Sequence, residues 1–317
     1  MTVSRAFKAD SSVSEATREA ILKAAEELGY VFDSTASNLR SQKTDFVAVT
    51  IPSINNANFA QTVRGLSEGL KARGLQILLG TTDYDPGEEE RLVEQLLRRR
   101  PEAIVVTGGQ HSDRTQRMLE KAGVPVVEIW DLPGQPIGHV VGFSNAGAMT
   151  GLVAHLVGRG LTRIAFVGGD DPADSRGAER RQGFLAAMAA HGLPPGPLVA
   201  TGAPPVSMRE GAEAMARLLD TAPQTEAVIC VSDLSAFGAL SECQRRGIAV
   251  PDQISIAGFG DYEIAAICHP ALTTINPFPR EIGARAAEVI LTALDGQADG
   301  PMVVEIAPEL LIRQSVR

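Results

Sequence analysis

Two patterns of hydrophobic and polar positions alternate from Thr44 to the end of the chain. Short runs of apolar, β-branched residues, such as DFVAVTIP at 45–52, predict strands that are buried on both faces. Amphipathic segments, such as ANFAQTVRGLSEGLKARG at 57–74, predict helices that end at a glycine. Strands that alternate with helices in this way are typical of doubly wound parallel sheets, so the expected fold class is α/β.

The alternation continues through about ten strands, which is more than one open sheet comfortably holds. Further strands are predicted at 75–82, 102–109, 124–130, 139–145, 162–169, 226–233 and 253–260, with two short ones near the C-terminus. Helices are predicted between them, at 86–100, 113–123, 146–160, 176–192, 208–222, 234–247 and 280–296. Residues 143–147 have the pattern of a boundary between two sheets, so we expect two lobes. A small ligand is then expected between the lobes, outside the carboxyl ends of the strands.

A different pattern precedes these lobes. The segment VSEATREAILKAAEELGY (13–30) predicts a helix that Ser14 caps and Gly29 ends. The opening MTVSRAF (1–7) also has helical spacing, with its apolar residues on one face. Residues 33–43 are polar and short of core residues, which indicates a linker.

Composition and charge limit the possible partners. The chain has 317 residues, of which 4% are aromatic, so stacking platforms for single-stranded nucleic acid are not expected. Its formal charge is −9, which argues against non-specific binding of polyanions by the whole surface. Residues 1–43 hold six basic and six acidic groups, so all of the excess negative charge lies in residues 44–317. Because residues 1–43 are neutral overall, the acidic charge of the rest of the chain does not prevent this N-terminal segment from contacting DNA.

The cysteines and the hydropathy pattern indicate a cytoplasmic protein. Cys230, Cys243 and Cys268 lack C-x-x-C spacing, which suits buried apolar positions in a reducing compartment. The chain has no apolar run of about 18 residues, so no membrane span is expected. Its N-terminal segment has no apolar signal region, so export is not expected either.

The sequence contains none of the common motifs for catalysis or cofactor binding. Glycine clusters such as VGGDDPADSRG at 167–177 follow strands, but no dinucleotide fingerprint, phosphate-binding loop or nucleophile elbow occurs. The five histidines are too scattered to form paired metal ligands. We therefore expect no catalytic residues, no metal site and no cofactor.

One arginine cluster lies at a predicted strand-to-helix junction that faces the expected cleft. Arg176 and Arg180 are four residues apart, so they share one face of the helix. A guanidinium at this place can bind a carboxylate or a pair of hydroxyls through two parallel hydrogen bonds. The alternative is an ion pair with a neighbouring acid, for which the candidates are Asp170, Asp171 and Glu179.

Several motifs, taken in order, resemble the LacI family of bacterial transcription regulators over essentially the whole chain. They are TVSRAF (2–7), VSEATREAILKAAEELGY (13–30), VAVTIPSINNANFAQTVRGL (47–66), RGAERRQGF (176–184), VSDLSAFGAL (231–240), VPDQISIAGFGD (250–261) and PALTTI (270–275). The stretches VVEIWDLPGQPIGHVVGFSN and GFGDYEIA resemble the gluconate-repressor branch in particular.

The resemblance implies three parts of the chain. A partial helix-turn-helix head is expected at 1–32 and a hinge helix or linker at 33–43. An effector-binding core, similar to periplasmic sugar-binding proteins, is expected at 44–317. Its N-lobe is expected at about 44–143 and 276–299, and its C-lobe at about 144–272 and 300–317.

Family positions carry over to this chain residue by residue. For DNA binding they are Thr2, Ser4 and Arg5 in the recognition helix and Asn38 and Leu39 in the hinge, where Leu39 would enter the minor groove. For effector binding they are Asn58, Phe59, Ser144, Asn145, Arg180, Ser232 and Asp233, and Arg176 joins them from the arginine cluster. The family commonly has an acidic residue where this chain has Gly260. A cleft without that acid suits an anionic sugar acid.

The resemblance also implies residues ahead of TVSRAF. Members of the family have about twenty residues there, which form the first helix of the motif and brace the recognition helix. A recognition helix without that support cannot hold its angle in the major groove. The sequence as given is therefore expected to bind an operator weakly.

The leading hypothesis is a cytoplasmic, homodimeric regulator, a repressor of genes for the use of carbohydrates or sugar acids. Its partners would be operator DNA and a small effector such as gluconate, which shifts a two-state equilibrium. Two alternatives stay open. A solute-binding protein for sugar transport would share the core, and a sugar-acid enzyme would share the sheet. The exact effector, the operator, the sign of the response and the choice between dimer and tetramer also stay open.

Overall fold

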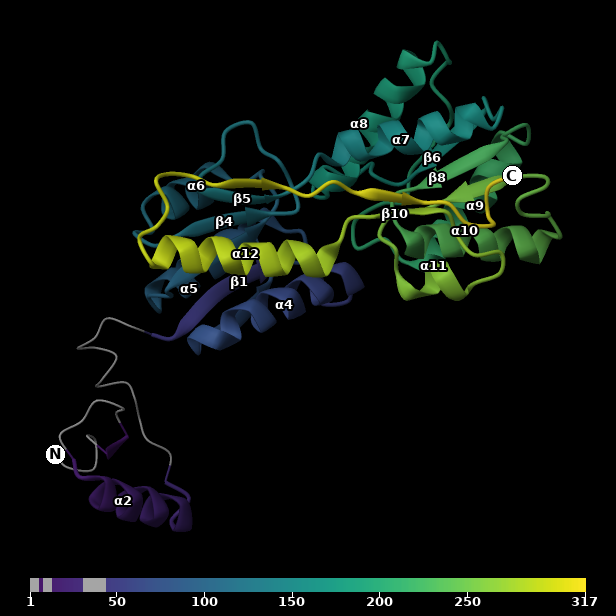
Figure 1. Ribbon diagram of the computed structural model, residues 1–317. Helices are drawn as coiled ribbons and strands as arrows, with labels where there is room; N and C mark the ends of the chain where they lie inside the picture. The colour runs from purple at the N-terminus through teal and green to yellow at the C-terminus, as the bar shows by residue number, and fades with distance from the viewer. Residues whose placement is uncertain (1–5, 8–12, 31–43) are drawn as a thin grey trace. The chain divides into compact units, whose positions relative to one another are not determined.

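The computed structural model describes residues 6–7, 13–30 and 44–317. The chain separates into two compact units, residues 1–44 and residues 45–317. Figure 1 shows the helices and strands of each unit. The second unit is built of parallel sheets and helices, which confirms the expected α/β fold class.

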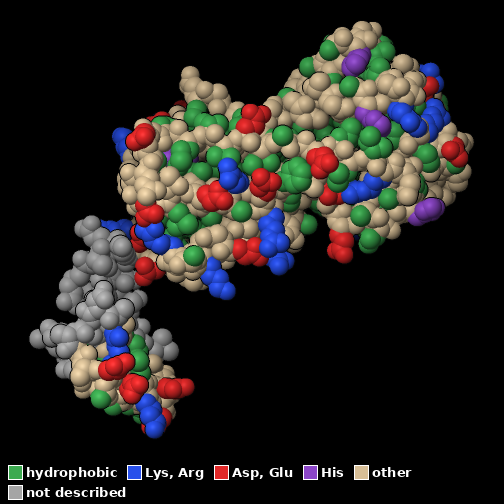
Figure 2. Space-filling model, viewed as in Figure 1, with side chains coloured by type: hydrophobic (Ala, Val, Ile, Leu, Met, Phe, Trp, Pro, Cys, Tyr) green, Lys and Arg blue, Asp and Glu red, His purple; other side chains and the backbone are tan. Residues whose placement is uncertain are grey.

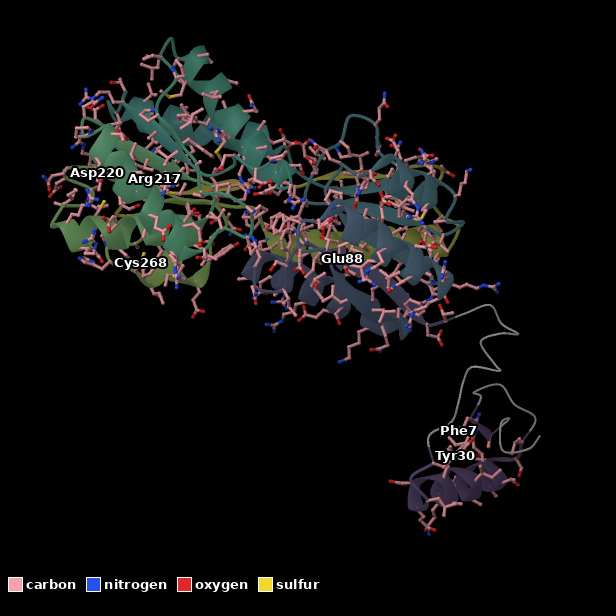
Figure 3. All side chains as sticks on the ribbon, turned by 180° about the vertical axis from the view of Figure 1, so that it is seen from behind. Phe7, Tyr30, Glu88, Arg217, Asp220 and Cys268 are labelled. Atoms are coloured by element: carbon pink, nitrogen blue, oxygen red, sulfur yellow. The ribbon has the colours of Figure 1, made fainter. Side chains whose placement is uncertain are left out.

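The described part of the first unit contains one long helix, α2 (Glu15–Glu27). Ser14 caps this helix as predicted, because its side chain accepts a hydrogen bond from a backbone amide of the first turn. Gly29 follows the helix with a left-handed φ of 61°, a conformation that ends helices. The rings of Phe7 and Tyr30 lie 6.2 Å apart, so the segments before and after α2 meet (Figure 3).

Six parallel strands form the sheet of the N-lobe, in the order β11-β5-β4-β3-β1-β2. The central strands are buried along their length, as their continuous apolar runs predict. Helix α12 packs along α4, and α5 packs against α6 (Figure 1). The strands are β1 (Phe46–Ile51), β2 (Gln76–Thr81), β3 (Ala103–Thr107), β4 (Val126–Ile129), β5 (His139–Gly142) and β11 (Val303–Glu305). The helices are α4 (Ala57–Leu70), the short η1 (Lys71–Arg73), α5 (Pro86–Arg98), α6 (Asp113–Glu120) and α12 (Pro279–Leu294).

Two glycines bring the backbones of α4 and α12 into direct contact. A Cβ added at Gly65 would fall 2.1 Å from the carbonyl oxygen of Arg280. One added at Gly283 would fall 2.0 Å from the carbonyl oxygen of Thr62. The hydroxyl of Thr62 donates a hydrogen bond to the carbonyl oxygen of Pro279 at 2.9 Å. Helix α12 is thus anchored in the N-lobe, although the chain reaches it only after it has built most of the C-lobe.

Four parallel strands form the sheet of the C-lobe, in the order β7-β6-β8-β9. Helix α7 packs against α8, and α9 packs against α10. The edge strand β7 has two residues, and the sequence pattern does not predict it. The strands are β6 (Ile164–Val167), β7 (Leu198–Val199), β8 (Ala227–Cys230) and β9 (Ser255–Ala257). The helices are α7 (Asn145–Gly158), α8 (Ser175–Ala190), α9 (Met208–Thr221), α10 (Asp233–Arg246) and α11 (Glu263–Ile267).

Three segments of the chain join the two lobes. The first leaves β5 after Gly142 and enters α7 at Asn145, within the stretch where the sequence predicts a boundary. The other two are β10 (Thr274–Asn276) and β12 (Glu309–Leu311), which pair antiparallel in a small sheet of their own. In Figure 1 the yellow C-terminal segment runs from one lobe into the other.

One terminal strand lies in a different lobe from the one expected. Residues 300–317 were assigned to the C-lobe, but β11 pairs in parallel with β5 in the N-lobe sheet. The chain crosses to the C-lobe only after β11, through β12. Without β11, the outer edge of β5 would present unpaired backbone groups, and a short apolar segment can satisfy them there.

One apolar core runs through both lobes. Val47 in the N-lobe and Phe184 in the C-lobe belong to the same cluster of buried side chains. Aromatic rings join the two parts, with centroid separations of 5.9 Å from Trp130 to Phe143 and 6.0 Å from Phe143 to Phe259. Closely packed apolar side chains therefore fill the part of the lobe junction around Phe143.

The surface carries charges of both signs. On the face shown in Figure 2, basic and acidic side chains are interspersed over the second unit. Many of them pair, such as Arg246 with Asp220 at 2.5 Å and Arg280 with Glu68 at 2.7 Å. Among the described helices, none is both long enough and apolar enough to cross a membrane.

Candidate ligand-binding cleft

A cavity of about 230 Å³ lies between the two lobes. It opens beyond the carboxyl ends of the strands, where ligands of open α/β sheets bind. The N-lobe contributes Asn55, Asn56, Asn58, Phe59, Tyr84 and Trp130. The C-lobe contributes Asp174, Arg176, Arg180, Pro204, Pro205, Val206, Ser207, Val231, Ser232, Leu234, Phe259 and Tyr262. Five of the predicted effector residues are thus brought together here: Asn58, Phe59, Arg176, Arg180 and Ser232.

Arg180 is a buried charge in the wall of this cavity. Its side chain rises from α8 and its guanidinium lies over the ring of Phe259, 4.4 Å from the centroid. One guanidinium nitrogen, Nη1, donates to the Oδ1 atom of Asn145 at 2.8 Å. Its Nε has no hydrogen-bond partner within the described part of the chain. Burial lowers the pKa of the guanidinium, but arginine stays charged at neutral pH, so Arg180 places a buried cation in the cavity wall.

A second arginine and one acid complete the charges at the cavity wall. Arg176 is 6% exposed and lies over the ring of Phe59, 5.7 Å from the centroid. Asp174 caps α8 by accepting a hydrogen bond from the Gly177 amide at 3.1 Å. Within the described lining, two guanidinium groups therefore face one carboxylate. The excess positive charge favours an anionic ligand.

Asn145 lies behind the cavity wall instead of in it. Its side chain is fully buried, and its Nδ2 donates to the carbonyl oxygen of Trp130 at 3.0 Å. Because its Oδ1 accepts from Arg180, this amide links an N-lobe backbone group to the C-lobe arginine. The resemblance implied a direct effector contact, but the position supports a role in holding Arg180. Ser144 also lies outside this cavity and caps α7 by accepting from the Gly147 amide.

Asp233 is likewise absent from the cavity lining. Its Oδ2 accepts a hydrogen bond from the amide of Tyr262 at 2.8 Å, and its Oδ1 accepts one from the hydroxyl of Thr274 at 2.6 Å. Burial raises the pKa of Asp233 to about 6, although both hydrogen bonds oppose the shift. Asp233 therefore ties the loop after β9 to the crossover strand β10.

Two tyrosines in the cavity were not among the predicted residues. The hydroxyl of Tyr262, from the C-lobe, donates to the Oδ1 atom of Asn56, from the N-lobe, at 2.7 Å. Gly260 makes room for the Tyr262 ring: its φ is +128°, and a Cβ there would fall 2.5 Å from the ring. Tyr84 comes from the loop after β2. No motif marks Tyr84, whereas Tyr262 lies within the stretch GFGDYEIA that resembles the gluconate-repressor branch. That stretch is the signal that could have found Tyr262.

The predicted DNA-binding residues lie outside the described residues: Thr2, Ser4, Arg5, Asn38 and Leu39. The expected hinge at 33–43 lies outside them too. In the described part of the chain, no group of three or more His, Cys, Asp or Glu side chains is arranged to hold a metal ion.

A pair of carboxyl groups faces across the junction of the lobes beside the cavity. Asp131 follows β4 and Glu179 lies on α8, and both line a hollow of about 450 Å³. Burial raises the pKa of Glu179 to about 7, and the charge of Asp131 and the hydrogen bond between the two groups add to the shift. Asp131 also accepts hydrogen bonds from two backbone amides. Below neutral pH the pair therefore shares a proton.

Glu179→Gln is expected to stabilise the protein at pH 8 but not near pH 4.5. The pKa of Glu179 is raised from 4.5, so its stabilising contribution is complete below pH 4.5 and is lost as the pH rises to about 7. Glutamine keeps a donor and cannot ionise, so the gain at pH 8 should reach about 2 kcal/mol. Urea unfolding at both pH values measures it, with the exposed Glu213→Gln as control. An equal gain at both pH values would refute the shared proton.

Two family models match the chain. The model for bacterial regulatory proteins of the lacI family matches residues 1–33. The model for a periplasmic binding protein-like domain matches residues 153–316. The first match covers the helical unit, and the second covers most of the C-lobe.

Similar proteins carry regulator names. The HTH-type transcriptional regulator GntR of Pseudomonas aeruginosa is 35% identical over 317 residues, which are 99% of this chain and 91% of that protein. A solved structure of a LacI family transcriptional regulator from Silicibacter pomeroyi is 42% identical, with a TM-score of 0.81 over 86% of this chain and 99% of that one. The lac repressor dimer bound to operator is 23% identical, with a TM-score of 0.85 over 99% and 94%, and shows the same fold. These proteins are named as regulators, not as enzymes.

Proposed function

The chain belongs to the lacI family of bacterial regulatory proteins, and from this we propose that it represses genes for the use of a sugar acid and responds to that acid as effector. It binds operator DNA through its N-terminal unit and the effector between the lobes of its second unit. The effector changes the affinity for DNA by favouring one arrangement of the lobes. A regulator of this kind works in the cytoplasm, where the chromosome is.

The observation that carries the choice of effector is the charge of the cavity. Arg176 and Arg180 face one carboxylate, Asp174, and Arg180 retains a spare donor. A carboxylate placed against Arg180 would gain charge-assisted hydrogen bonds, which are about twice as strong as neutral ones. Amide and hydroxyl groups of Asn56, Asn58 and Ser232 surround the same space and suit a chain of hydroxyls. Gluconate has both features.

The contacts of Arg180 suggest how binding would reach the rest of the protein. An anion on Arg180 acts on Asn145, which holds the Trp130 carbonyl of the other lobe. Asn145 also begins α7 directly after the first crossover. A ligand that draws these groups together would favour the closed arrangement of the lobes. We propose that the chain forms a homodimer, as the lac repressor of the same fold does on its operator, and that the dimer transmits the change in lobe arrangement to the DNA-binding unit.

A solute-binding protein for sugar transport is the second candidate, since it would share the two-lobed core. The match of the lacI-family model to residues 1–33 favours the regulator, because a transport protein has no use for a DNA-binding head. An enzyme acting on sugar acids is not favoured, because the matched relatives are regulators.

Thermal unfolding with a panel of compounds tests the effector class. The panel contains gluconate, other aldonates, phosphosugars and neutral sugars. A bound effector stabilises the folded state by about 2.7 kcal/mol at a hundredfold excess over Kd. Aldonates are expected to raise the melting temperature and neutral sugars are not. A panel without any response would reject the proposal.

The coupling to DNA is tested on double-stranded DNA selected from a random pool. Binding is measured by fluorescence anisotropy at about 50 mM salt, where phosphate contacts are strong enough to reveal weak complexes. Gluconate is expected to change the affinity for the selected DNA by at least about fivefold. An affinity that stays the same while gluconate is bound would argue for a binding protein without a regulatory response.

Tyr262→Phe is expected to weaken gluconate binding about fivefold, because the hydrogen bond between the lobes is lost and the ring is kept. The acceptor of that bond, the Oδ1 atom of Asn56, still accepts from the Asn58 amide, so the unliganded protein should keep its melting temperature. Calorimetric titration measures the change, with Tyr30→Phe as the matched control. A Kd within twofold of wild type would show that the bond does not support closure.

A further inference from the structure

A second compartment lies beside the cavity that holds the two arginines. Its volume is about 300 Å³, and it lies between the loops that follow β1, β2 and β3 and the loop at residues 172–175. Tyr84 and Arg176 line both compartments, so the two spaces adjoin along these side chains. The nature of the walls changes from one to the other. The first compartment is lined by Phe59, Trp130 and Phe259 among others, whereas the described lining of the second has no phenylalanine or tryptophan and is richer in hydroxyl and carboxyl groups.

Tyr84, which lines both compartments, has an uncommon backbone conformation. Asp83 and Tyr84 both have positive φ values, 49° and 61°, although neither is glycine. Consecutive residues in this region cost conformational energy, and such strain gathers at ligand sites. Burial raises the pKa of the Tyr84 phenol, so it remains a neutral donor and acceptor at the boundary. The loop therefore fixes a rigid polar ring between the two spaces.

The far wall of the second compartment carries a buried charged pair. The Nδ1 atom of His111 lies 3.0 Å from both carboxylate oxygens of Glu89. Their side chains are 2% and 11% exposed. Burial alone would lower the pKa of His111, but the hydrogen bond to Glu89 and the charges of Glu89 and Glu128 raise it overall. His111 thus holds the carboxyl group of Glu89 in place, and the Glu89 oxygens keep lone pairs that can accept further hydrogen bonds.

A fixed carboxylate among hydroxyls recognises a hydroxylated ligand, not a second anion. Thr82, Ser112 and Ser175 line the same compartment. The hydroxyls of Thr82 and Ser175 can donate or accept a hydrogen bond, whereas that of Ser112 already donates to the Oε1 atom of Glu90 at 2.7 Å. The Glu89 oxygens can accept hydrogen bonds from sugar hydroxyls. The described lining of this compartment sets two acids, Asp85 and Glu89, against Arg176 and His111, so it lacks the excess positive charge of the first compartment. The carboxylate of a ligand is therefore expected in the first compartment, beside Arg180 and Arg176.

We propose that the two compartments form one elongated site for a sugar acid that carries a second, neutral sugar unit. Its carboxylate would bind Arg180 and Arg176 in the first compartment. Its second sugar would lie past Tyr84 and bind the Glu89–His111 pair. This inference rests on the proposed function, since it takes the anion-binding role of the first compartment as given.

The test compares gluconate with three glycosyl-gluconates that differ in linkage: lactobionate, maltobionate and melibionate. Each is titrated calorimetrically into wild type, Ala173→Trp and Ala189→Trp. Ala173 is exposed and lines the second compartment, so a tryptophan there fills that space and leaves the first one open. Ala189 is also an exposed alanine, lies on α8, and lines neither compartment.

At least one glycosyl-gluconate is expected to bind wild type no more weakly than gluconate does. Ala173→Trp should weaken that ligand at least tenfold and leave gluconate within twofold, while Ala189→Trp changes neither. Gluconate binding without binding of any glycosyl-gluconate overturns the elongated site alone. Equal loss of both ligands in Ala173→Trp, or loss of neither, also overturns it. Failure of all four ligands on wild type rejects the proposed function itself.

Discussion

Arg180→Met is expected to abolish binding of gluconate and to change the stability of the unliganded protein by no more than about 2 kcal/mol. The arginine offers a carboxylate two charge-assisted hydrogen bonds, so its loss should weaken binding about 100-fold or more. The free protein loses one hydrogen bond, to Asn145, and is relieved of a buried cation whose Nε lacks a partner among the described residues. Methionine fills a similar volume over the Phe259 ring and removes the cost of burying a cation. It also leaves the buried Oδ1 atom of Asn145 without a donor, which costs about 1–3 kcal/mol, so the two effects oppose each other.

Two measurements separate the ligand-binding role of Arg180 from a structural one. Calorimetric titration gives the affinity for gluconate, and urea unfolding without ligand gives the stability. Arg181→Met is the matched control, since Arg181 is the next residue of α8 and lies outside the cavity lining. A loss of several kcal/mol in the unliganded Arg180→Met protein would mean that the arginine is structural. Retained affinity would mean that the anion binds elsewhere.

Gly260→Ala is expected to destabilise the second unit by about 3 kcal/mol. Two effects add up at this position. The backbone has a φ of +128°, which residues other than glycine rarely adopt, and the new Cβ would sit 2.5 Å from the ring of Tyr262 and 2.9 Å from the side-chain Nδ2 atom of Asn58. Both neighbours line the cavity, so the ring can move only by giving up its hydrogen bond to Asn56. Gluconate affinity should fall together with stability.

A control glycine separates backbone strain from the clash. Gly300 has a φ of +155° and nothing within 4 Å of an added Cβ. Gly300→Ala should therefore cost about 1 kcal/mol, the strain alone. Tyr262→Ala supplies the second control, because without the ring Gly260→Ala should cost only the strain, about 1 kcal/mol. Urea unfolding of wild type, the three single variants and the Gly260→Ala/Tyr262→Ala double variant gives the values. Equal losses at Gly260 and Gly300 would show that the tyrosine does not need the space.

The sequence predicts the succession of strands and helices well because the elements of the second unit have strong patterns. A strand such as β3 is apolar and buried at every position, and helix α5 begins at a proline after an aspartate cap. It misses β7, because two residues carry no periodicity. It also places β11 in the wrong lobe, because the choice of a partner at a sheet edge depends on the finished fold.

Some residues of the candidate site can be predicted from the sequence and others cannot. Arg176 and Arg180 are predicted from their helical spacing, and both line the cavity. The family positions predict effector contacts for Asn145 and Asp233, yet their side chains lie behind the cavity wall and hold Arg180 and the loop of Tyr262. Side chains of one motif can point in different directions, and their spacing in the sequence does not show which of them enter the cavity. Tyr262 meets Asn56 only because the lobes come together.

The proposal that this cleft recognises an anion is tested most directly by a matched pair of ligands. Gluconate and glucitol have the same hydroxylated chain and differ only in that one carries a carboxylate where the other carries a hydroxymethyl group. Calorimetric titration of wild type is expected to show one gluconate per chain, bound at least about 100-fold more tightly than glucitol. Equal affinities, or tighter binding of glucitol, would contradict the assignment of Arg180 and Arg176 to a carboxylate.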